Sequence, residues 1–253
     1  MNADKLQKTA IITGASSGIG KALAFEMAQK GYNLGLVSRR LEALEQVRTD
    51  IKQQCSNNIN IEIETLDVAE DHTILPVLEK LSNTLGGTDI IVANAGITAV
   101  NRTGTGNFSV DRNVIQINLI GAMATVDAAA ALFRKQKKGH IVGISSVTAW
   151  VGIPGSSAYS SSKAGFTTYL QAVRGELRKK NIQVTTIHPG FIDTDIAENM
   201  GSKPFVISAK KAAGQMLSAI EKKKSSVIVP NLPWSVVTKL ITLLPEKIVA
   251  RAL

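Results

Sequence analysis

Short apolar runs alternate along the chain with longer segments in which apolar residues recur at helical spacing. Most of the short runs are continuously apolar, which is typical of strands buried on both faces of a sheet. They predict strands at Thr9–Thr13, Leu34–Val37, Ile61–Leu66, Ile90–Ala93, His140–Ser145, Gln183–His188 and Val227–Val229. The longer segments predict helices at about Gly18–Lys30, Leu41–Cys55, Asp71–Leu85, Val110–Lys137, Ala158–Lys180 and Ser208–Lys223.

This alternation predicts a single doubly wound α/β domain, with about seven parallel strands and helices on both faces. We expect the domain to span residues 1–230 and an apolar tail to span residues 231–253. Ligands bind beyond the carboxyl ends of the strands in such a sheet. The loops Asn101–Asn107 and Ile196–Ile207 each follow a strand, so both are expected to border the site.

Composition narrows the class of protein. Aromatic residues make up only 4% of the chain, so aliphatic residues and alanine must fill the core. The single cysteine, Cys55, excludes an internal disulfide framework and favours a reducing compartment. The segment Met1–Lys8 is polar, and no apolar run reaches the ~18 residues of a spanning helix. We therefore expect a cytoplasmic protein.

The charge is basic, with 29 Lys and Arg against 20 Asp and Glu, a net charge of +9. This excess suits nucleic acid, an acidic membrane surface or a phosphorylated cofactor. The basic clusters at Lys135–Lys138, Arg178–Lys180 and Lys222–Lys224 lie near predicted helix C-termini, where cations complement the helix dipole. Since no aromatic residues are interleaved with them, we expect no nucleic-acid partner.

A glycine-rich turn joins the first predicted strand to the first predicted helix. It reads Thr13-Gly14-Ala15-Ser16-Ser17-Gly18-Ile19-Gly20. Gly14 can turn tightly, Gly18 lets the backbone approach a pyrophosphate, and Gly20 lets the helix sit close to the strand. The helix N-terminus offers free N–H groups to phosphate. A purely structural turn is the alternative, but the flanking strand and helix favour a dinucleotide site formed by Gly14, Ser16, Ser17, Gly18, Ile19 and Gly20.

The end of the second predicted strand indicates which dinucleotide binds. NAD enzymes usually place an acidic residue here for the ribose hydroxyls, but this chain has none before Glu42. Arg39 can instead give a fork of donors to a 2′-phosphate, and Ser38 can add a hydroxyl. The alternative is that Arg39 and Arg40 are solvated residues opening a helix, where cations are mildly unfavourable. We therefore expect NADP(H) as the cofactor.

A tyrosine and a lysine, Tyr159 and Lys163, lie four residues apart on a predicted helix and so share one face. A nearby ammonium group favours phenolate, so we expect Lys163 to lower the pKa of Tyr159 from its usual ~10. Ser146, thirteen residues before Tyr159, follows the fifth strand and can bind a substrate carbonyl oxygen. The adjacent Ser145 is the alternative. Side chains alternate along a strand, so we expect the two serines to point in opposite directions and only one of them to face the site.

These motifs together resemble the short-chain dehydrogenase/reductase family over roughly Lys8–Val229. The family fingerprint Thr-Gly-x-x-x-Gly-x-Gly is present, as is a second motif, Asn94-Ala95-Gly96. The segment from Ser145 through Tyr159 and Lys163 matches the family's active site in order and spacing. The resemblance implies a Rossmann fold, an NADP-preferring oxidoreductase and a dimer or tetramer.

The resemblance also implies site residues that the pattern alone does not identify. It makes Asn118 a fourth catalytic residue beside Ser146, Tyr159 and Lys163, at a local helix distortion. It assigns Tyr159 and Lys163 to the nicotinamide ribose as well. His188 replaces a commoner small or polar residue, and we interpret it as loop support. The remaining cofactor contacts that the resemblance implies are Asp67 and Val68 at adenine, Asn94, Ala95 and Gly96 beside the cofactor, and Pro189, Gly190, Ile192 and Thr194 near nicotinamide.

We therefore expect an enzyme that reduces a ketone or aldehyde with NADPH and acts on a small-molecule substrate. The alternatives are an NADP-binding regulator or scaffold without turnover, and a membrane-surface reductase of lipid-like ketones. His72 and His140 show no metal-ligand spacing, so no metal site is predicted. The small apolar stretch Ala122–Ala131 favours packing against a second copy, hence a homo-oligomer.

The C-terminal tail carries apolar residues at helical spacing. Trp234, Val237, Leu240, Ile241 and Leu244 recur, Pro245 interrupts, and Ile248, Val249 and Leu253 continue. The tail can pack on the domain or on a neighbouring subunit, cover an apolar substrate, or lie on a membrane.

Overall fold

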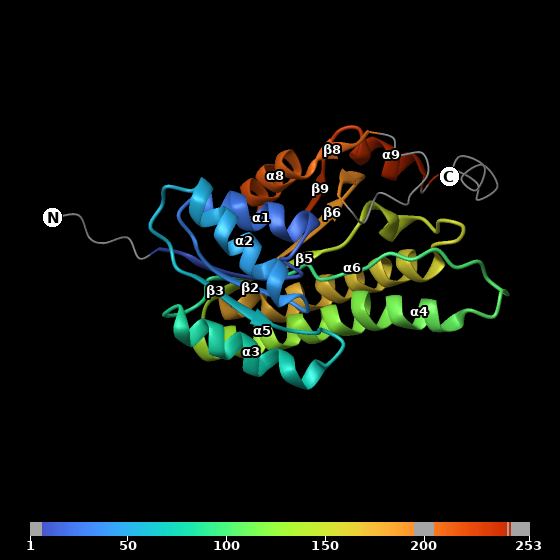
Figure 1. Ribbon diagram of the computed structural model, residues 1–253. Coiled ribbons are helices and arrows are strands. Elements are labelled where there is room, and N and C mark those ends of the chain that lie inside the picture. The colour runs from blue at the N-terminus through green and yellow to red at the C-terminus, as the bar shows by residue number, and fades with distance from the viewer. Residues whose placement is uncertain (1–6, 195–204, 242, 244–253) are drawn as a thin grey trace.

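The computed structural model describes residues 7–194, 205–241 and 243, and its centre is a sheet of seven parallel strands (Figure 1). The strand order is β3-β2-β1-β4-β5-β6-β9, so the winding direction reverses between β1 and β4. This confirms the predicted doubly wound fold. The strands are β1 (Thr9–Thr13), β2 (Asn33–Ser38), β3 (Ile61–Thr65), β4 (Ile90–Ala93), β5 (Gly139–Ile144), β6 (Ile182–Pro189) and β9 (Ser226–Val229).

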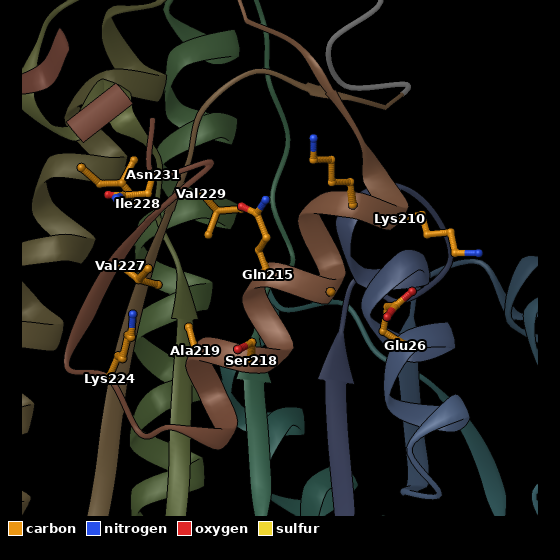
Figure 2. Close-up of a pocket in the computed structure, with 12 residues that line it drawn as sticks. Glu26, Lys210, Gln215, Ser218, Ala219, Lys224, Val227, Ile228, Val229 and Asn231 are labelled. Carbon is orange, nitrogen blue, oxygen red and sulfur yellow. The ribbon is translucent and has the colours of Figure 1, made fainter. Parts of the chain in front are cut away.

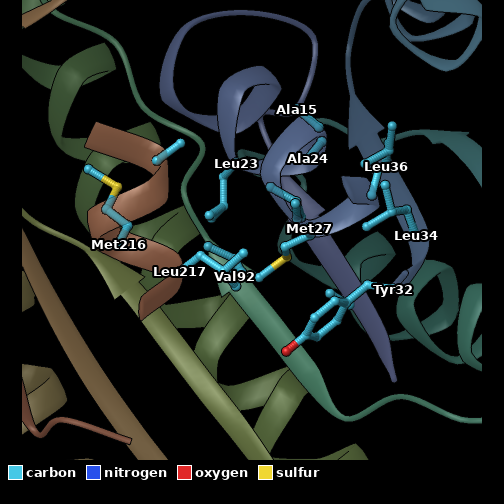
Figure 3. Packing of buried hydrophobic residues seen from close by; sticks show 14 of the residues in the cluster. Ala15, Leu23, Ala24, Met27, Tyr32, Leu34, Leu36, Val92, Met216 and Leu217 are labelled. Atoms are coloured by element: carbon cyan, nitrogen blue, oxygen red, sulfur yellow. The ribbon is translucent and has the colours of Figure 1, made fainter. Parts of the chain in front are cut away.

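Helices cover both faces of the sheet (Figure 1). One face carries α1 (Gly18–Gln29), α2 (Leu41–Gln54) and α8 (Ala209–Glu221). The other carries α3 (Asp71–Thr84), α4 (Phe108–Ile115), α5 (Ala122–Gln136) and α6 (Ser157–Leu177). Figure 3 shows the first layer, in which Met216 and Leu217 of α8 approach Leu23 and Met27 of α1 above Val92 of the sheet. The core is aliphatic, as the composition predicts.

The predicted single helix Val110–Lys137 is interrupted. A π-helical turn, η1 (Gln116–Gly121), separates α4 from α5, and the helical segment begins earlier, at Phe108. Asn118 lies inside this turn, which is the local distortion that the family resemblance implied. The helical segment Phe108–Gln136 is long and apolar enough to cross a membrane by length and composition, and half of its most apolar window is buried within the fold.

Several short elements were not predicted. They are η2 (Val147–Trp150), η3 (Arg178–Lys180), and a small parallel pair of strands, β7 (Ile192–Asp193) and β8 (Ile207–Ser208). Ile207 was expected in an irregular loop and instead pairs with Ile192. The rest of that predicted loop, residues 196–204, lies outside the described residues.

The described part of the tail forms α9 (Trp234–Ile241), which packs against η2 and β9. Trp234 and Thr238 are buried on its inner side. The opposite side exposes an apolar stripe consisting of Leu232, Val236, Leu240 and Leu243. The predicted tail positions Leu244, Pro245, Ile248, Val249 and Leu253 lie outside the described residues.

Candidate active site

The glycine-rich loop is anchored to the end of β4. Asn94 Nδ2 donates to the carbonyl oxygens of Thr13 (2.8 Å) and Gly14 (3.2 Å). Thr13 Oγ1 accepts from the backbone N–H groups of Asn94 (3.0 Å) and Ala95 (3.1 Å). The two motifs that lie far apart in sequence are thus locked together where the sheet changes winding direction, which is where dinucleotides bind in such folds.

The shape of this loop suits a pyrophosphate. Gly14 has a φ of +66°, and a methyl group there would lie 2.8 Å from Ala95 Cα, so only glycine fits. Gly18 has a φ of +55°, and a methyl group there would have only Thr194 near it, at 3.6 Å. The Ser17 side chain does not cap α1, which leaves first-turn N–H groups available to an anion. The loop residue Ile19 packs against the core, and Gly20 sits against the Gly14 carbonyl.

A residue that the sequence did not single out braces this loop. Arg40 Nη2 donates to Ser16 Oγ (3.0 Å) and to Ser17 Oγ (2.9 Å). Ser38 Oγ is engaged with the Arg40 backbone, accepting from its N–H at 3.1 Å and donating to its carbonyl at 3.3 Å. Two adjacent arginines after β2 and two serines in the loop were the available signals. Both arginines therefore border the predicted 2′-phosphate position.

Arg39, the predicted phosphate ligand, is exposed and lies 3.9 Å (Nη1 to Oδ2) from Asp67. Asp67 follows β3, and its Oδ1 accepts from the Ala69 N–H at 3.0 Å. Val68 is buried, and its carbonyl lies against Gly121 at the end of the π turn. The structure thus places Asp67, one of the two predicted adenine contacts, beside Arg39.

Two serines follow β5, and the structure separates their roles. Ser145 Oγ donates to the Lys163 carbonyl (3.0 Å) and is hydrogen-bonded to Thr167 Oγ1 (2.7 Å), so it is a structural link to α6. Ser146 Oγ instead accepts from the Thr148 N–H at 3.1 Å, and its hydroxyl acts to lower the pKa of the Tyr159 phenol. This geometry favours Ser146 over Ser145 as the substrate-binding hydroxyl.

The ionisation of the Tyr159 and Lys163 pair differs from the prediction. Burial raises the pKa of Tyr159 above 10.0 and outweighs the opposing hydrogen bond from Ser146. Burial also lowers the pKa of Lys163 to about 8. Lys163 Nζ donates to the Ile144 carbonyl (3.0 Å) and lies 5.7 Å from the centre of the Tyr159 ring. The expected lowering by Lys163 was wrong for the free protein, because desolvation dominates at this depth.

The side chains of Asn118 and Lys163 both lie close to Gly96. A methyl group at Gly96 would lie 3.2 Å from Asn118 Oδ1 and 3.6 Å from Lys163 Nζ. The Asn118 side chain is fully buried; its Oδ1 accepts from the Ile97 N–H and its Nδ2 donates to the Ile97 carbonyl, both at 2.8 Å. The π turn therefore holds the loop after β4 close to Lys163, the predicted catalytic lysine.

The end of β6 supplies the remaining predicted cofactor residues. Gly190 follows Pro189, and its N–H donates to the Val229 carbonyl at 2.9 Å. The Ile192 side chain is buried in the core, so only its backbone is available to a ligand. Thr194 lies beside Gly18 of the glycine-rich loop. This segment and the loop after β1 thus approach each other.

His188 supports the segment that follows β5, in line with its interpretation as a loop-supporting residue. Burial lowers its pKa to about 4, so the ring is neutral at pH 7, and its Nδ1 lies 3.3 Å from the Ser146 carbonyl. His140 is also buried, with a pKa lowered to about 4, and its Nε2 lies 2.8 Å from Thr185 Oγ1. No group of metal-ligating side chains is found in the described part of the chain.

A pocket of about 550 Å³ lies elsewhere, between α1, α8 and β9 (Figure 2). Gln215 and Ser218 of α8 face Val227 and Val229 of β9 across it. None of the predicted catalytic residues lines it. It therefore takes no part in the site at the carboxyl ends of the strands.

Comparison of the sequence with known proteins agrees with this geometry. The family model described as short chain dehydrogenase matches residues 8–204. An uncharacterized oxidoreductase of Mycobacterium tuberculosis is 32% identical over 242 residues, which are 95% of each chain. A 3-oxoacyl-(acyl-carrier-protein) reductase of Bos taurus is 31% identical over 229 residues, 90% of this chain and 93% of that one.

Solved structures share the fold. A short-chain type dehydrogenase/reductase from Mycobacterium marinum has a TM-score of 0.80 at 26% identity, covering 88% of this chain and 94% of that one. An alcohol dehydrogenase from Thermococcus sibiricus complexed with 5-hydroxy-NADP has a TM-score of 0.75 at 24% identity, covering 88% and 95%. A short chain dehydrogenase/reductase from Burkholderia phymatum in complex with NAD has a TM-score of 0.83 at 20% identity, covering 93% and 92%.

The family model covers most of the chain, and the relatives align over nearly its full length. Of the neighbours that share the fold, one was solved with 5-hydroxy-NADP and another with NAD. The chain is therefore an oxidoreductase that belongs to the short-chain dehydrogenase/reductase family and has its NAD(P)-binding fold.

Proposed function

We propose that the protein is an NADPH-dependent reductase that converts a ketone or aldehyde to an alcohol. The observation that carries the proposal is the pair of Tyr159 and the buried Lys163, one helical turn apart on α6, with Lys163 Nζ 5.7 Å from the centre of the Tyr159 ring. Lys163 and Asn118 both lie close to Gly96, at the carboxyl ends of the central strands, where the glycine-rich loop also lies. Bound NADPH supplies the hydride that reduces the carbonyl carbon.

The protein's own residues supply the proton and orient the oxygen. The Thr148 N–H donates to Ser146 Oγ at 3.1 Å and holds the hydroxyl in place, and we assign its hydrogen to the substrate carbonyl oxygen when a substrate is bound. Tyr159 is protonated at neutral pH, and we assign its phenol the role of donating the proton to that oxygen during reduction. The phenolate left behind regains a proton from solvent, and we assign Lys163 and Asn118 to that relay and Lys163 to the nicotinamide ribose.

The preference for NADPH rests on charge at the end of β2. Arg39 is exposed beside Asp67, and Arg40 reaches Ser16 and Ser17 of the glycine-rich loop. Two guanidinium groups at this position favour a 2′-phosphate over a bare ribose. We further propose a cytoplasmic enzyme, because a single cysteine suits a reducing compartment.

A membrane-surface reductase of lipid-like ketones is the second candidate. It is favoured by exposed apolar side chains at α9, which are Val236 and Leu240 on the helix, Leu232 before it and Leu243 after it. An amphipathic helix with such a face suits the interface of a lipid bilayer. The enzyme would then take its ketone substrate from the lipid bilayer and not from the aqueous phase.

The test is NADPH oxidation with a panel of carbonyl compounds, supplied both in water and in phospholipid vesicles. Tyr159→Phe should bind NADPH normally but reduce carbonyls ~10²-fold more slowly or worse, the scale for losing a positioned acid. Tyr169→Phe is the matched control, because Tyr169 lies partly buried on the same helix and outside the site. Turnover only of ketones supplied in vesicles, and not of those supplied in water, would favour the membrane-surface reductase.

Near wild-type turnover by Tyr159→Phe would contradict the assigned acid. Binding of NADPH without turnover of any carbonyl or alcohol would instead favour a regulator or scaffold. Both outcomes are separable, because fluorescence titration measures cofactor binding independently of the rates.

A further inference from the structure

Aromatic side chains gather beside the site although they are scarce in this chain. The sequence has only two tryptophans, and both lie here. Trp150 on η2 stacks on His188, with ring centres 4.4 Å apart. Trp234 on α9 meets the rings of Phe191 and Phe205 edge-on, at 5.6 and 6.1 Å. Because α9 packs against η2, the two groups form neighbouring parts of one wall.

Trp234 lies directly on the backbone of the predicted nicotinamide segment. A methyl group at Gly190 would collide with the indole at Nε1, Cδ1 and Cε2. The side chain is only 6% exposed, and its Nε1 has no hydrogen-bond partner among the described residues. Burying a donor without a partner costs free energy, so nearly all buried polar groups in native proteins are paired. An exception beside a binding site points to an acceptor that the ligand brings.

A second unpartnered polar atom lies on the adjacent element. Thr148 Oγ1 is buried and has no partner, and the residue is 8% exposed. Its own N–H donates to Ser146 Oγ, so this hydroxyl belongs to the residue that supports the substrate-binding serine. The aromatic group therefore carries two unpartnered polar atoms, a combination that small-molecule sites commonly present to a ligand.

The flat rings and the indole donor together define a class of ligand. Aromatic faces and edges pack best on flat apolar rings. The indole N–H can only donate, so its partner must be an acceptor such as a carbonyl oxygen. The nitrogen lies against the Gly190 backbone in the free protein, so an acceptor reaches it after the indole itself moves. Phe205, which meets the Trp234 ring edge-on and is 55% exposed, can move with it.

We propose that Trp234 is a specificity-determining residue whose indole N–H binds a second oxygen of a flat cyclic or aromatic dicarbonyl substrate. This inference rests on the proposed carbonyl reduction. In it, Ser146 and Tyr159 hold the oxygen that is reduced, and Trp234 holds the oxygen that is not. A monocarbonyl of the same skeleton leaves the indole unpaired, so it is the poorer substrate.

The test compares acenaphthenequinone with acenaphthenone, flat ketones that differ by one carbonyl group. Trp234→Phe keeps an aromatic ring and removes the donor. It should lower kcat/KM for the diketone by about 2- to 12-fold, the range given by one net hydrogen bond of 0.5–1.5 kcal/mol. It should leave the monoketone and the dissociation constant of NADPH unchanged. Trp150→Phe, the matched control, should not alter the ratio between the two ketones.

Calorimetry measures the binding of both ketones independently of turnover. It would be done with NADPH present, on Tyr159→Phe and on the double variant Tyr159→Phe, Trp234→Phe. Loss of turnover with all carbonyls would defeat the proposed function, while selective diketone binding through Trp234 would still support this inference. Equal losses for the two ketones would reduce Trp234 to a packing residue. Weaker NADPH binding by Trp234→Phe would assign the indole to the cofactor, and either result would overturn the proposal.

Discussion

At the scale of single residues, burial governs the pKa values of the Tyr159 and Lys163 pair, raising the first and lowering the second. Tyr159 and Lys163 share a face because they lie four apart on α6, which a helical pattern is enough to predict. The raised pKa of Tyr159 depends on how much protein surrounds the phenol. Local sequence does not encode that depth, so charge proximity alone gave the wrong direction.

The arginine pair after β2 shows the same limit. Arg39 and Arg40 are adjacent in sequence, yet one lies beside Asp67 and the other donates to Ser16 and Ser17. Residue type predicted a phosphate site, but the direction of each side chain follows from the fold of the loop after β1. Arg40 was therefore missed.

The choice of cofactor can be tested at Arg39. Arg39→Asp should weaken NADPH binding ~10- to 100-fold more than NADH binding, because it removes a charge-assisted contact to the 2′-phosphate and adds repulsion. Fluorescence titration with both cofactors measures the ratio. Lys52→Asp is the control, since it makes the same charge change at an exposed position of α2. Equal weakening of both cofactors by Arg39→Asp would refute the NADPH preference.

At the scale of elements, long periodic segments were predictable and short or irregular ones were not. The ends of β1 and β4 matched the prediction, since each is a continuous apolar run ending at a turn. The two-residue strands β7 and β8 are too short to show any period. The π turn inside Val110–Lys137 is invisible to helical periodicity, and only the family resemblance at Asn118 pointed to it.

Asn118 joins the π turn to the loop after β4, so its loss should be a structural as well as a catalytic defect. Asn118→Ala leaves the Ile97 N–H and carbonyl unpaired in the interior. We expect a loss of about 2–4 kcal/mol in the free energy of unfolding, or roughly 5–15 °C in Tm, together with slower reduction. Thermal unfolding checks this, with Asn113→Ala, an exposed position on α4, as the control. An unchanged Tm for Asn118→Ala would contradict the bracing role.

At the scale of the whole molecule, the sheet was predictable because buried parallel strands leave the strongest apolar signal in the sequence. Assembly is less directly encoded. The small apolar stretch Ala122–Ala131 was expected to contact a partner, but Ala122, Val126, Ala128 and Ala129 pack in the core of the same chain. The surface left for a second copy is the outer side of the long helices.

On α6 that outer side is made of small and polar residues. Thr168, Gln171, Ala172 and Gly175 are exposed there, and short side chains let a facing helix approach closely. A second copy related by a two-fold axis would bring the same face of α6 against itself, as closed dimers do. We therefore keep the prediction of a homo-dimer or homo-tetramer and place the contact on α6.

Light scattering at micromolar concentration should find an oligomer for the wild-type protein and a smaller species for Ala172→Glu. The substitution sets two like charges facing each other across a symmetric contact and buries them, which costs several kcal/mol. Because Ala172 is exposed in the single chain, each subunit should keep its fold and its NADPH affinity. Thr49→Glu adds the same charge to an exposed position of α2, on the opposite face of the sheet, and should leave the mass unchanged. A wild-type monomer would refute the oligomer, and an unchanged oligomer in Ala172→Glu would move the interface away from α6.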